Sequence, residues 1–372
     1  MIKKTKSKTF GAYIRELRID NKIGQRELAQ KIGIAASYLN DIEKNKRTAP
    51  KLIVIEKLSL FLKAEINLLN DLAGNTKKTL APDIINYIEK NPNIISLIRA
   101  AKNNNLGDEE INDLELTINK SKTKALIVAA GLGSRLKKHT ESTPKCMLDF
   151  GGKTLLQRQL LSYKQNGVDN ISLIRGYKKN KINYKGIKYF DNNDYKNNNI
   201  LNSIFYGEQV INGNIIISYS DILFEPFVVK RAMEADHDIS VIVDVDWKHY
   251  YVDRQDHPLS EAENVIFNSN NEVIKIGKIA SEKEEVHGEF IGMIKLNHRG
   301  CELLKQNFNR VKKIFWNKPF QRAKIFQKAY LTDMIQELVD IGVKVHCVII
   351  ERGWKEIDTV EDYKKALIAF NK

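Results

Sequence analysis

The chain has 372 residues, a formal net charge of +14 and 42% hydrophobic residues, enough for two or three domains with their own cores. Its start, MIKKTKSKTF, is basic but lacks the apolar segment of a secretory signal, and no run of eighteen apolar residues predicts a membrane span. The three cysteines are far apart and the seven histidines show no ligand spacing, which excludes a disulfide framework and a cysteine-based zinc site and favours a cytoplasmic protein.

The basic charge is concentrated at the front of the chain. Residues 1–80 carry 17 Lys and Arg against 8 Asp and Glu, whereas residues 81–120 carry 4 against 7. This excess is expected of a segment that meets a polyanion, although a biased genome rich in lysine codons would produce it as well.

The first elements are three short helices, in FGAYIRELRIDN, QRELAQKIG and ASYLNDIEKNKR. We expect Ala29, Ile34, Leu39 and Ile42 to be the buried contacts that fix the second helix against the third, and Gly33 to allow the sharp turn between them. The segment KLIVIEKLSLFLKAEINLLNDL supplies the closing helices.

The stretch GQRELAQKIGIAASYLNDIEKNKRTAP, within residues 8–72, resembles the helix-turn-helix domain of the phage-repressor (Cro/CI, XRE) family, with Asn45 where glycine is usual. The resemblance implies that the third helix enters the major groove of DNA. It assigns a phosphate contact to Gln25, a groove-facing position to Ala36, Ser37, Tyr38 and Asn40, and backbone contacts to Lys44, Lys46 and Arg47. A helical bundle used for protein contacts is the alternative.

Residues 81–120 predict three more amphipathic helices, with Pro82 and Pro92 at helix starts. This acidic segment is interpreted as a linker or a dimerisation element, and a plain spacer is an equal alternative. The predicted organisation is therefore an all-α DNA-binding domain at 1–75, a helical linker at 76–120 and an α/β domain at 121–372.

The α/β domain begins with KALIVAAGLGSRL, a buried strand, a glycine loop and the opening of a helix. This arrangement points backbone N–H groups at phosphate, but it matches neither a Walker loop nor the dinucleotide fingerprint. The residues after the loop carry a more specific pattern. Arg135 comes two residues after the second glycine, TPK ends at Lys145, a β-branched strand ends at Asp221, and GWKEIDTVEDYKKA contains Asp358.

These motifs, in this order, resemble the nucleotidyltransferase superfamily of Rossmann-like nucleoside diphosphate-sugar pyrophosphorylases. The resemblance implies a mixed, mostly parallel sheet, catalytic roles for Arg135 and Lys145, and Mg²⁺ held by Asp221 and Asp358. It also implies a triphosphate held by the glycine loop, which comprises Ala129, Ala130, Gly131, Leu132, Gly133 and Ser134. In that chemistry an acceptor phosphate or phosphonate oxygen attacks the α-phosphorus of a nucleoside triphosphate and pyrophosphate leaves. Both reactants are anions, so alignment and charge neutralisation suffice without a general base.

The segment NDYKNNNILNSIFYG indicates which nucleotide is used. Asn199 to Ile204 looks like the corresponding segment of the cytidylyltransferases that activate phosphocholine, inositol phosphate and phosphonates. We place Asn199 and Ser203 near the nucleotide, since an Asn amide can satisfy a pyrimidine edge. The alternative is a plain helix cap.

The region 244–296 predicts the acceptor site, because carboxylates next to aromatic side chains suit a cationic head group. The candidates for an amine or a metal are Asp246, Glu263 and Glu289; the candidates for an anionic group are Arg254 and Lys278; and Trp247 and Tyr250 supply aromatic rings. A solvated loop charge is the alternative for each charged residue.

The sequence thus predicts a CTP-dependent cytidylyltransferase that joins CMP to a small phosphonate, such as 2-aminoethylphosphonate, or to phosphocholine. The predicted enzyme acts as a homodimer and carries an accessory DNA-binding domain. Two alternatives stay open: a sugar-1-phosphate nucleotidyltransferase, and a transcriptional regulator whose enzyme-like domain senses a ligand. The presence of Arg135, Lys145, Asp221 and Asp358 favours an active enzyme over a degenerate sensor.

Overall fold

The computed structural model describes residues 9–62, 64, 66–111, 114, 123–251, 254, 256, 259–278 and 285–370. The chain divides into two compact units, Met1–Ile111 and Asn112–Lys372. Within these described ranges, no helix is long and apolar enough to cross a membrane.

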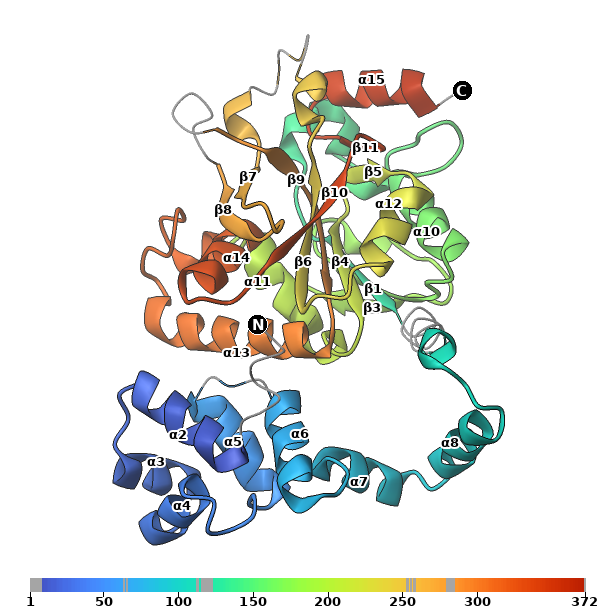
Figure 1. The fold of residues 1–372 in the computed structure, drawn as a ribbon. Coiled ribbons are helices and arrows are strands. Elements are labelled where there is room, and N and C mark those ends of the chain that lie inside the picture. The colour runs from blue at the N-terminus through green and yellow to red at the C-terminus, as the bar shows by residue number, and fades with distance from the viewer. Residues whose placement is uncertain are drawn as a thin grey trace. The chain divides into compact units, whose positions relative to one another are not determined.

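The first unit is entirely helical in its described part (Figure 1). Its helices are α2 (Phe10–Asp20), α3 (Gln25–Ile32), α4 (Ala36–Glu43), α5 (Leu52–Leu62), α6 (Ile66–Lys77), α7 (Pro82–Lys90) and α8 (Ile94–Asn103). Ala29, Leu39 and Ile42 are buried in one apolar cluster and Ile34 packs against it, as the helix-turn-helix pattern predicts. Gly33 ends α3 in the left-handed conformation, which a residue without a Cβ adopts at no steric cost.

The contact between α2 and α4 requires a glycine that the sequence pattern did not single out. A Cβ added at Gly11 would lie 1.9 Å from the carbonyl oxygen of Ile42. The two helices therefore approach closely at a point where no side chain fits. At the end of α4, Asn45 occupies the left-handed region with φ 56°, which explains why glycine is the usual residue there.

We expect Gly11→Ala to destabilise the first unit by about 1–3 kcal/mol, because the added methyl group overpacks a backbone contact. Differential scanning calorimetry of the full chain should show a lower temperature for the first unit's transition, with nucleotidyl transfer unchanged. Gly24→Ala is the matched control, since a Cβ at Gly24 would meet only the side chain of Glu27 at 3.8 Å. Equal unfolding temperatures for the two variants would contradict the close contact.

Helices α7 and α8 confirm two of the three helices predicted for residues 81–120, and Pro82 begins α7. Most of the third falls outside the described residues, although 108–111 are helical. Neither α7 nor α8 buries a residue. Four of their apolar side chains are 45–54% exposed: Ile84, Tyr87, Leu97 and Ile98.

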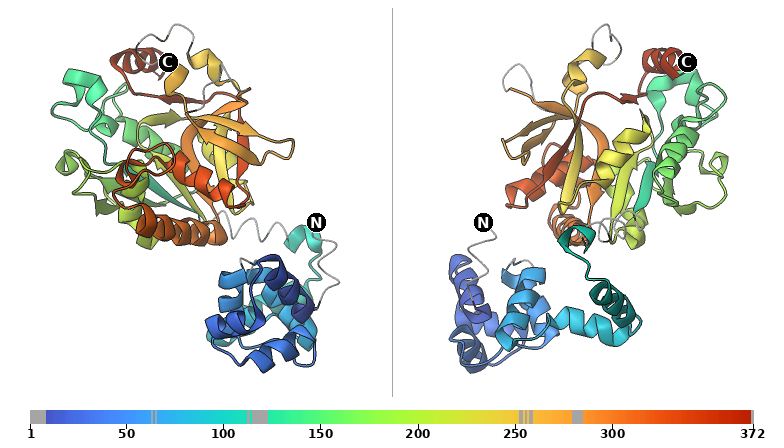
Figure 2. Two further views of the ribbon diagram at one scale, coloured as in Figure 1. Left: turned by 90° about the vertical axis from the view of Figure 1, so that its left-hand side faces the viewer. Right: turned by 45° about the vertical axis from the view of Figure 1, so that its right-hand side comes forward.

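The second unit is an α/β domain built on one mixed sheet (Figures 1 and 2). The strands along the sheet are, in order, β10 (His346–Ile350), β6 (Ile239–Asp244), β9 (Gly288–Leu296), β4 (Ile215–Tyr219), β1 (Lys124–Ala129), β2 (Asn170–Arg175) and β3 (Lys188–Asp191). Only β9 among these seven runs antiparallel to its neighbours, so the sheet is mostly parallel, as predicted. Strands β7 (Asn264–Phe267) and β8 (Val273–Gly277) form a hairpin that joins the sheet through β9.

Helices cover both faces of the sheet because the central strands are apolar on both sides. Ala125, Ile127 and Ala129 of β1 pack with α10 (Leu155–Gln165) and α12 (Pro226–Met233). Leu126 and Val128 point to the opposite face. That face is covered by α11 (Ile200–Ile204), α13 (His298–Phe315) and α14 (Leu331–Asp340). The continuous apolar run of β1 is typical of a parallel strand buried on both faces.

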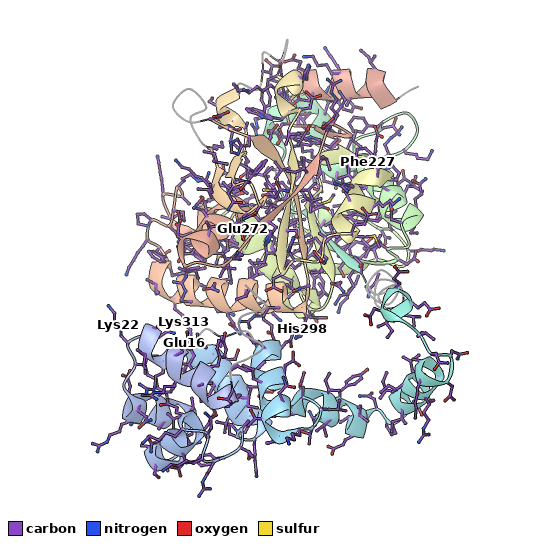
Figure 3. All side chains as sticks on the ribbon, in the orientation of Figure 1. Glu16, Lys22, Phe227, Glu272, His298 and Lys313 are labelled. Atoms are coloured by element: carbon purple, nitrogen blue, oxygen red, sulfur yellow. The ribbon has the colours of Figure 1, made fainter. Side chains whose placement is uncertain are left out.

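The hairpin also contacts the edge of the sheet near β10. Glu272, labelled in Figure 3, forms an isolated bridge with His346. Its carboxylate pairs with Lys344 and accepts a hydrogen bond from Asn268 at 3.1 Å. These contacts fix the hairpin that carries one wall of the candidate site.

Candidate active site

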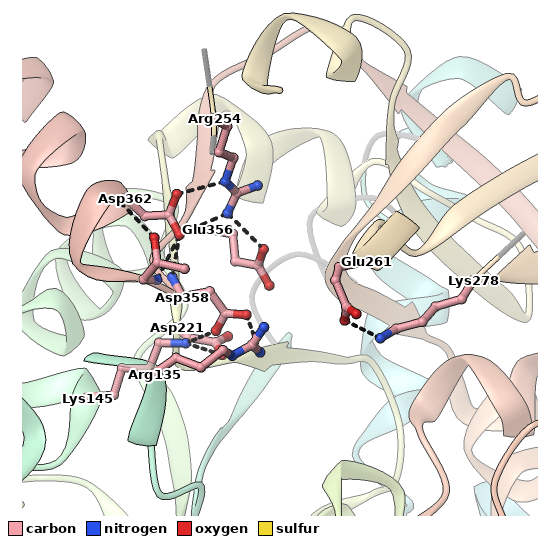
Figure 4. Close-up of polar contacts among 10 residues, drawn as sticks. Arg135, Lys145, Asp221, Arg254, Glu261, Lys278, Glu356, Asp358 and Asp362 are labelled. Carbon is pink, nitrogen blue, oxygen red and sulfur yellow. Dashed lines mark hydrogen bonds and ion pairs between the residues drawn. The ribbon is translucent and has the colours of Figure 1, made fainter. Parts of the chain in front are cut away.

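Two basic and two acidic side chains meet beyond the carboxyl ends of β1 and β4 (Figure 4). The Nζ atom of Lys145 lies 2.9 Å from Oδ2 of Asp221 and also bonds Oδ1 of Asp358. Arg135 pairs with the other oxygen of Asp358. Lys145 is buried, whereas the Arg135 side chain is 55% exposed. The structure thus brings together the four residues that the motifs singled out.

The pairing of two short strands holds the two aspartates together. Strand β5 (Ile222–Phe224) follows Asp221 directly, and it pairs antiparallel with β11 (Trp354–Glu356), which ends two residues before Asp358. The backbone N–H of Ile357 donates to the carbonyl oxygen of Asp221 at 2.9 Å. Two carboxylates from distant parts of the sequence are therefore fixed by backbone contacts.

A third acidic side chain, Glu356, to which the motifs assigned no role, lies beside this cluster (Figure 4). Burial, together with the nearby Asp358 and Asp221, raises the pKa of Glu356 well above its usual range. Burial opposes the charge of Lys145, but the attraction of Asp221 and Asp358 outweighs it and raises the pKa of the Lys145 ammonium. The lysine is therefore a permanent positive charge among carboxylates.

The two carboxylates fit a divalent cation whose remaining ligands come from the substrate and water. Oδ1 of Asp221 is buried without a hydrogen-bond partner. Among the residues that the structure describes, no three Asp, Glu, His or Cys side chains form a metal cage. Mg²⁺ is commonly bound by one or two carboxylates plus phosphate oxygens and waters, so Asp221 and Asp358 suffice for such a site.

A cavity of about 380 Å³ opens beside this cluster. Its walls include all eight residues predicted to bind the nucleotide: Ala129, Ala130, Gly131, Leu132, Gly133, Ser134, Asn199 and Ser203. Gly133 has a φ of 62°, and a Cβ there would lie 3.1 Å from Cβ of Lys145. Glycine is therefore required where the loop passes the lysine.

The segment after the loop differs from the predicted helix opening. Residues Ser134–Thr140 form a 3-10 helix interrupted at Lys137, whose φ is 50°. The Thr140 hydroxyl donates to the carbonyl oxygen of Gly133 at 2.8 Å, which folds this segment back on the loop. The loop is therefore not followed by the N-terminus of a regular α-helix, and its own backbone N–H groups remain the candidate phosphate-binding feature.

The part of the cavity wall that includes Asn198 contains an asparagine network that the sequence motifs did not reveal. Nδ2 of Asn192 donates to Asn198 and to the hydroxyl of Ser203, both at 2.9 Å. Asn198 and Tyr195 line the cavity. Asn199 caps α11, and its amide donates to the carbonyl oxygen of Lys328 at 3.2 Å. The run NNDYKNNN was the available signal for these additional polar groups.

Two of the predicted acceptor residues, Glu263 and Lys278, also line the cavity. Glu261 and Tyr330, which the sequence pattern did not single out, line the same wall. Lys278 pairs with the carboxylate of Glu261, and its Nζ lies 5.7 Å from the centre of the Tyr330 ring. Burial raises the pKa of Glu263 above its usual range.

The other predicted acceptor residues do not line this cavity. Trp247 is 1% exposed, Asp246 pairs with Arg352, and Glu289 accepts a hydrogen bond from the Tyr251 hydroxyl at 2.7 Å. Burial raises the pKa of Glu289 to about 8. Asp246 and Glu289 were predicted to bind the acceptor but are instead engaged by Arg352 and Tyr251. The side chain of Tyr250 lies outside the described residues.

Arg254 also lies away from the cavity, in a buried ion pair. Its Nε donates to Oδ1 of Asp362 at 2.7 Å, and one of its amino groups lies 3.3 Å from Glu356. Asp362 in turn accepts the backbone N–H of Asp358 at 3.0 Å, at the start of α15 (Val360–Phe370). Arg254 therefore supports the segment that carries Asp358, instead of facing an acceptor as predicted.

In the first unit, the predicted DNA-facing residues lie at the front of α4 and after its end. Ser37 and Arg47 are exposed, while Ala36, Tyr38 and Asn40 are partly buried. The Arg47 guanidinium lies 5.4 Å from the centre of the Tyr38 ring. The Gln25 amide donates to Glu43 at 2.9 Å, and Arg18 pairs with the same carboxylate, so Gln25 is tied to the core of the motif.

Comparison with known proteins defines the class of both units. A helix-turn-helix family model matches residues 14–69, and a model of the MobA-like NTP transferase domain matches residues 125–270. The chain therefore joins a helix-turn-helix domain to a nucleotidyltransferase domain, as its motifs predict. Residues 125–270 thus match a nucleotidyltransferase domain, an enzyme class, and two similar proteins are named as cytidylyltransferases.

Three similar proteins agree with this class. The chain is 27% identical over 251 residues to CTP:phosphoglutamine cytidylyltransferase of Campylobacter jejuni, covering 64% of this chain and 96% of that protein. It is 32% identical over 106 residues to choline-phosphate cytidylyltransferase of Streptococcus pneumoniae, covering 27% of this chain and 46% of that protein. The inositol-1-phosphate CTP transferase from T. maritima shares the fold, with a TM-score of 0.53 and 21% identity over 67% of this chain and 96% of that one.

Proposed function

We propose that the chain is a Mg²⁺- and CTP-dependent cytidylyltransferase that transfers CMP to a small phosphonate or phosphorylated amino compound and releases pyrophosphate. The observation that carries this proposal is the placement of Lys145 between Asp221 and Asp358, directly beneath the glycine loop. A buried cation between two carboxylates beside a phosphate-sized cavity suits the alignment of two phosphate anions.

Each residue of the cluster has a role in that reaction. The backbone N–H groups of Leu132, Gly133 and Ser134 hold the triphosphate, with Arg135 at its exposed side. The acceptor oxygen, already ionised, attacks the α-phosphorus opposite the leaving pyrophosphate. Lys145 stabilises the negative charge that builds on the α-phosphate and the leaving group. Asp221 and Asp358 would hold Mg²⁺, which would supply further charge neutralisation.

Cytosine is the base favoured by the relatives and by the asparagine network. Asn198, Asn199 and Ser203 line the part of the cavity that we assign to the nucleotide, and the two asparagine side chains carry both amide donors and carbonyl acceptors. A pyrimidine edge needs both kinds of group. Relatives named for CTP support the same choice.

The first unit supplies DNA binding in the same proposal, through Gln25, Ala36, Ser37, Tyr38, Asn40 and Arg47. The exposed apolar side chains of α7 and α8 suit a homodimer contact, so residues 76–120 act as a dimerisation linker between domains at 1–75 and 121–372. We assign the protein to the cytoplasm. A ligand-sensing regulator is the second candidate, favoured by the presence of the helix-turn-helix domain itself.

Pyrophosphate release tests the enzyme proposal. CTP, UTP, ATP and GTP are crossed with 2-aminoethylphosphonate, phosphocholine, inositol-1-phosphate and glucose-1-phosphate in the presence of Mg²⁺. Turnover with CTP and an amino-bearing acceptor supports the proposal. Turnover with glucose-1-phosphate alone supports a sugar nucleotidyltransferase, and CTP binding without any turnover supports the regulator.

The substitution Arg254→Met tests whether Arg254 supports the segment that carries Asp358. We expect the Mg²⁺ concentration for half-maximal rate to rise by about 10-fold or more, because contacts behind a metal ligand control its affinity. Arg352→Met is the matched control, since Arg352 pairs with Asp246 and its side chain is 57% exposed. A lower rate with an unchanged Mg²⁺ requirement would show that Arg254 contributes to folding alone.

A further inference from the structure

A Lys–Glu ion pair faces the catalytic cluster from the opposite wall of the cavity (Figure 4). Glu261 ends the 3-10 helix Leu259–Glu261, and Lys278 directly follows β8. Asn264 of β7 pairs with Gly277 of β8, so the antiparallel register continues to Glu263 opposite Lys278, and the Lys278 ammonium pairs with Glu261 two residues earlier. The two side chains are 41% and 37% exposed, within reach of a ligand.

Glu263 adds a second carboxylate to the same wall. It accepts a hydrogen bond from the Thr332 hydroxyl, at the start of α14. Asp333 pairs with Arg322 at 2.8 Å and also accepts the backbone N–H of Tyr330 at 2.8 Å. The backbone of Tyr330 is thereby held, and the centre of its ring lies 5.7 Å from Nζ of Lys278. The wall presents two carboxylates, one ammonium group and an aromatic face.

We propose that the acceptor is zwitterionic: besides its phosphoryl or phosphonyl group it carries an ammonium group, received by Glu261 and Glu263, and a carboxylate, received by Lys278. This inference rests on the proposed function and names the substrate class of the same site. The ligand would exchange the internal ion pair for two matched ion pairs, so no charge in the cavity loses its partner.

Other acceptor classes match this wall less well. A neutral polyol phosphate would place hydroxyl groups against Glu261, Glu263 and Lys278. Charged side chains form stronger hydrogen bonds with charged partners. An amine without a carboxylate competes with Lys278 for Glu261 and leaves that lysine without a replacement partner. A zwitterion alone satisfies both signs of charge.

Two matched sets of acceptors test this proposal by calorimetric binding to the full chain with CTP and by turnover with Mg²⁺. The first set is O-phosphoserine, phosphoethanolamine without the carboxylate, and 3-(phosphonooxy)propanoate without the amine. The second is 2-amino-4-phosphonobutanoate, 3-aminopropylphosphonate and 4-phosphonobutanoate. In at least one set we expect the zwitterion to bind about 10-fold more tightly than both analogues, as a lost charged contact requires. Equal binding of an analogue in both sets would overturn the proposal.

Two variants test which side chain of the cavity binds which charged group of the acceptor. Lys278→Gln should remove the preference for the carboxylate and keep that for the amine, and Glu263→Gln should do the reverse. Lys275→Gln, on β8 but not in the cavity wall, is the control and should change neither preference. Identical acceptor preferences in Lys278→Gln and the unmodified protein would overturn the assignment.

Binding and turnover together distinguish a wrong acceptor class from a wrong enzyme class. Selective binding of a zwitterion without turnover of any acceptor would support the inference and contradict the cytidylyltransferase. Turnover of phosphocholine or inositol-1-phosphate, with no binding of either zwitterion, would support the enzyme and overturn the zwitterionic acceptor.

Discussion

Replacing Lys145 by Met is expected to slow pyrophosphate release by about 100- to 1,000-fold, the range typical of a lost transition-state donor. The lysine is the buried cation between Asp221 and Asp358, and its removal deprives both carboxylates of this ion pair where a triphosphate has to bind. Steady-state rates with saturating CTP and acceptor measure the effect. The loss should appear in kcat, since charge on the α-phosphate and pyrophosphate grows as the reaction proceeds.

Lys295→Met is the matched control for a buried lysine. Lys295 is 5% exposed on β9 and donates to the carbonyl oxygen of Ala235, away from the cavity. Its replacement should alter thermal stability with little effect on kcat. A comparable loss of kcat in both variants would indicate that burial of a lysine, not its position beneath the loop, explains the result.

Replacing Asp221 by Ala is expected to abolish measurable turnover, a loss of about 1,000-fold or more, and to leave DNA binding unchanged. Asp221 provides the buried oxygen that has no partner within the described residues, together with the contact to Lys145. Asp221→Asn keeps the size of the side chain and isolates the charge. Rates over a range of Mg²⁺ concentrations, alongside DNA binding by each variant, measure both halves of the expectation.

Asp236→Ala provides the comparison for the loss of a carboxylate, because the Asp236 side chain is 92% exposed and lies outside the cavity. Full activity of Asp221→Ala would refute the metal assignment. Weakened DNA binding in that variant would show that the catalytic cluster influences the helix-turn-helix domain.

Local patterns in the sequence were sufficient for the helix-turn-helix core and for the catalytic cluster. Positions such as Leu39 and Ile42 are determined by helical periodicity, and a strand end followed by Asp221 indicates a sheet edge. Gly11 was missed, because its close contact with Ile42 depends on how two helices cross. A crossing point leaves no periodic signal in either helix.

The acceptor region could be predicted only in part, since burial of a charge depends on a partner far away in sequence. Arg254 and Asp362 are 108 positions apart, so neither residue reveals the other. Arg254 therefore looked like a free anion-binding group, whereas the fold uses it to support Asp358. Conversely, the sequence pattern did not single out Glu261, whose ion pair with Lys278 joins residues 17 positions apart.

The pairing of β5 with β11 has a consequence for protein synthesis. Lys145 and Asp358 are 213 positions apart, and the strand that brings them together is among the last parts to leave the ribosome. The helix-turn-helix core is complete by residue 77. Domains generally fold as units during translation, with the N-terminal one first. If the first unit binds DNA as proposed, a nascent chain gains that ability well before the catalytic cluster forms, and a prematurely terminated product would keep DNA binding without ever assembling the cluster.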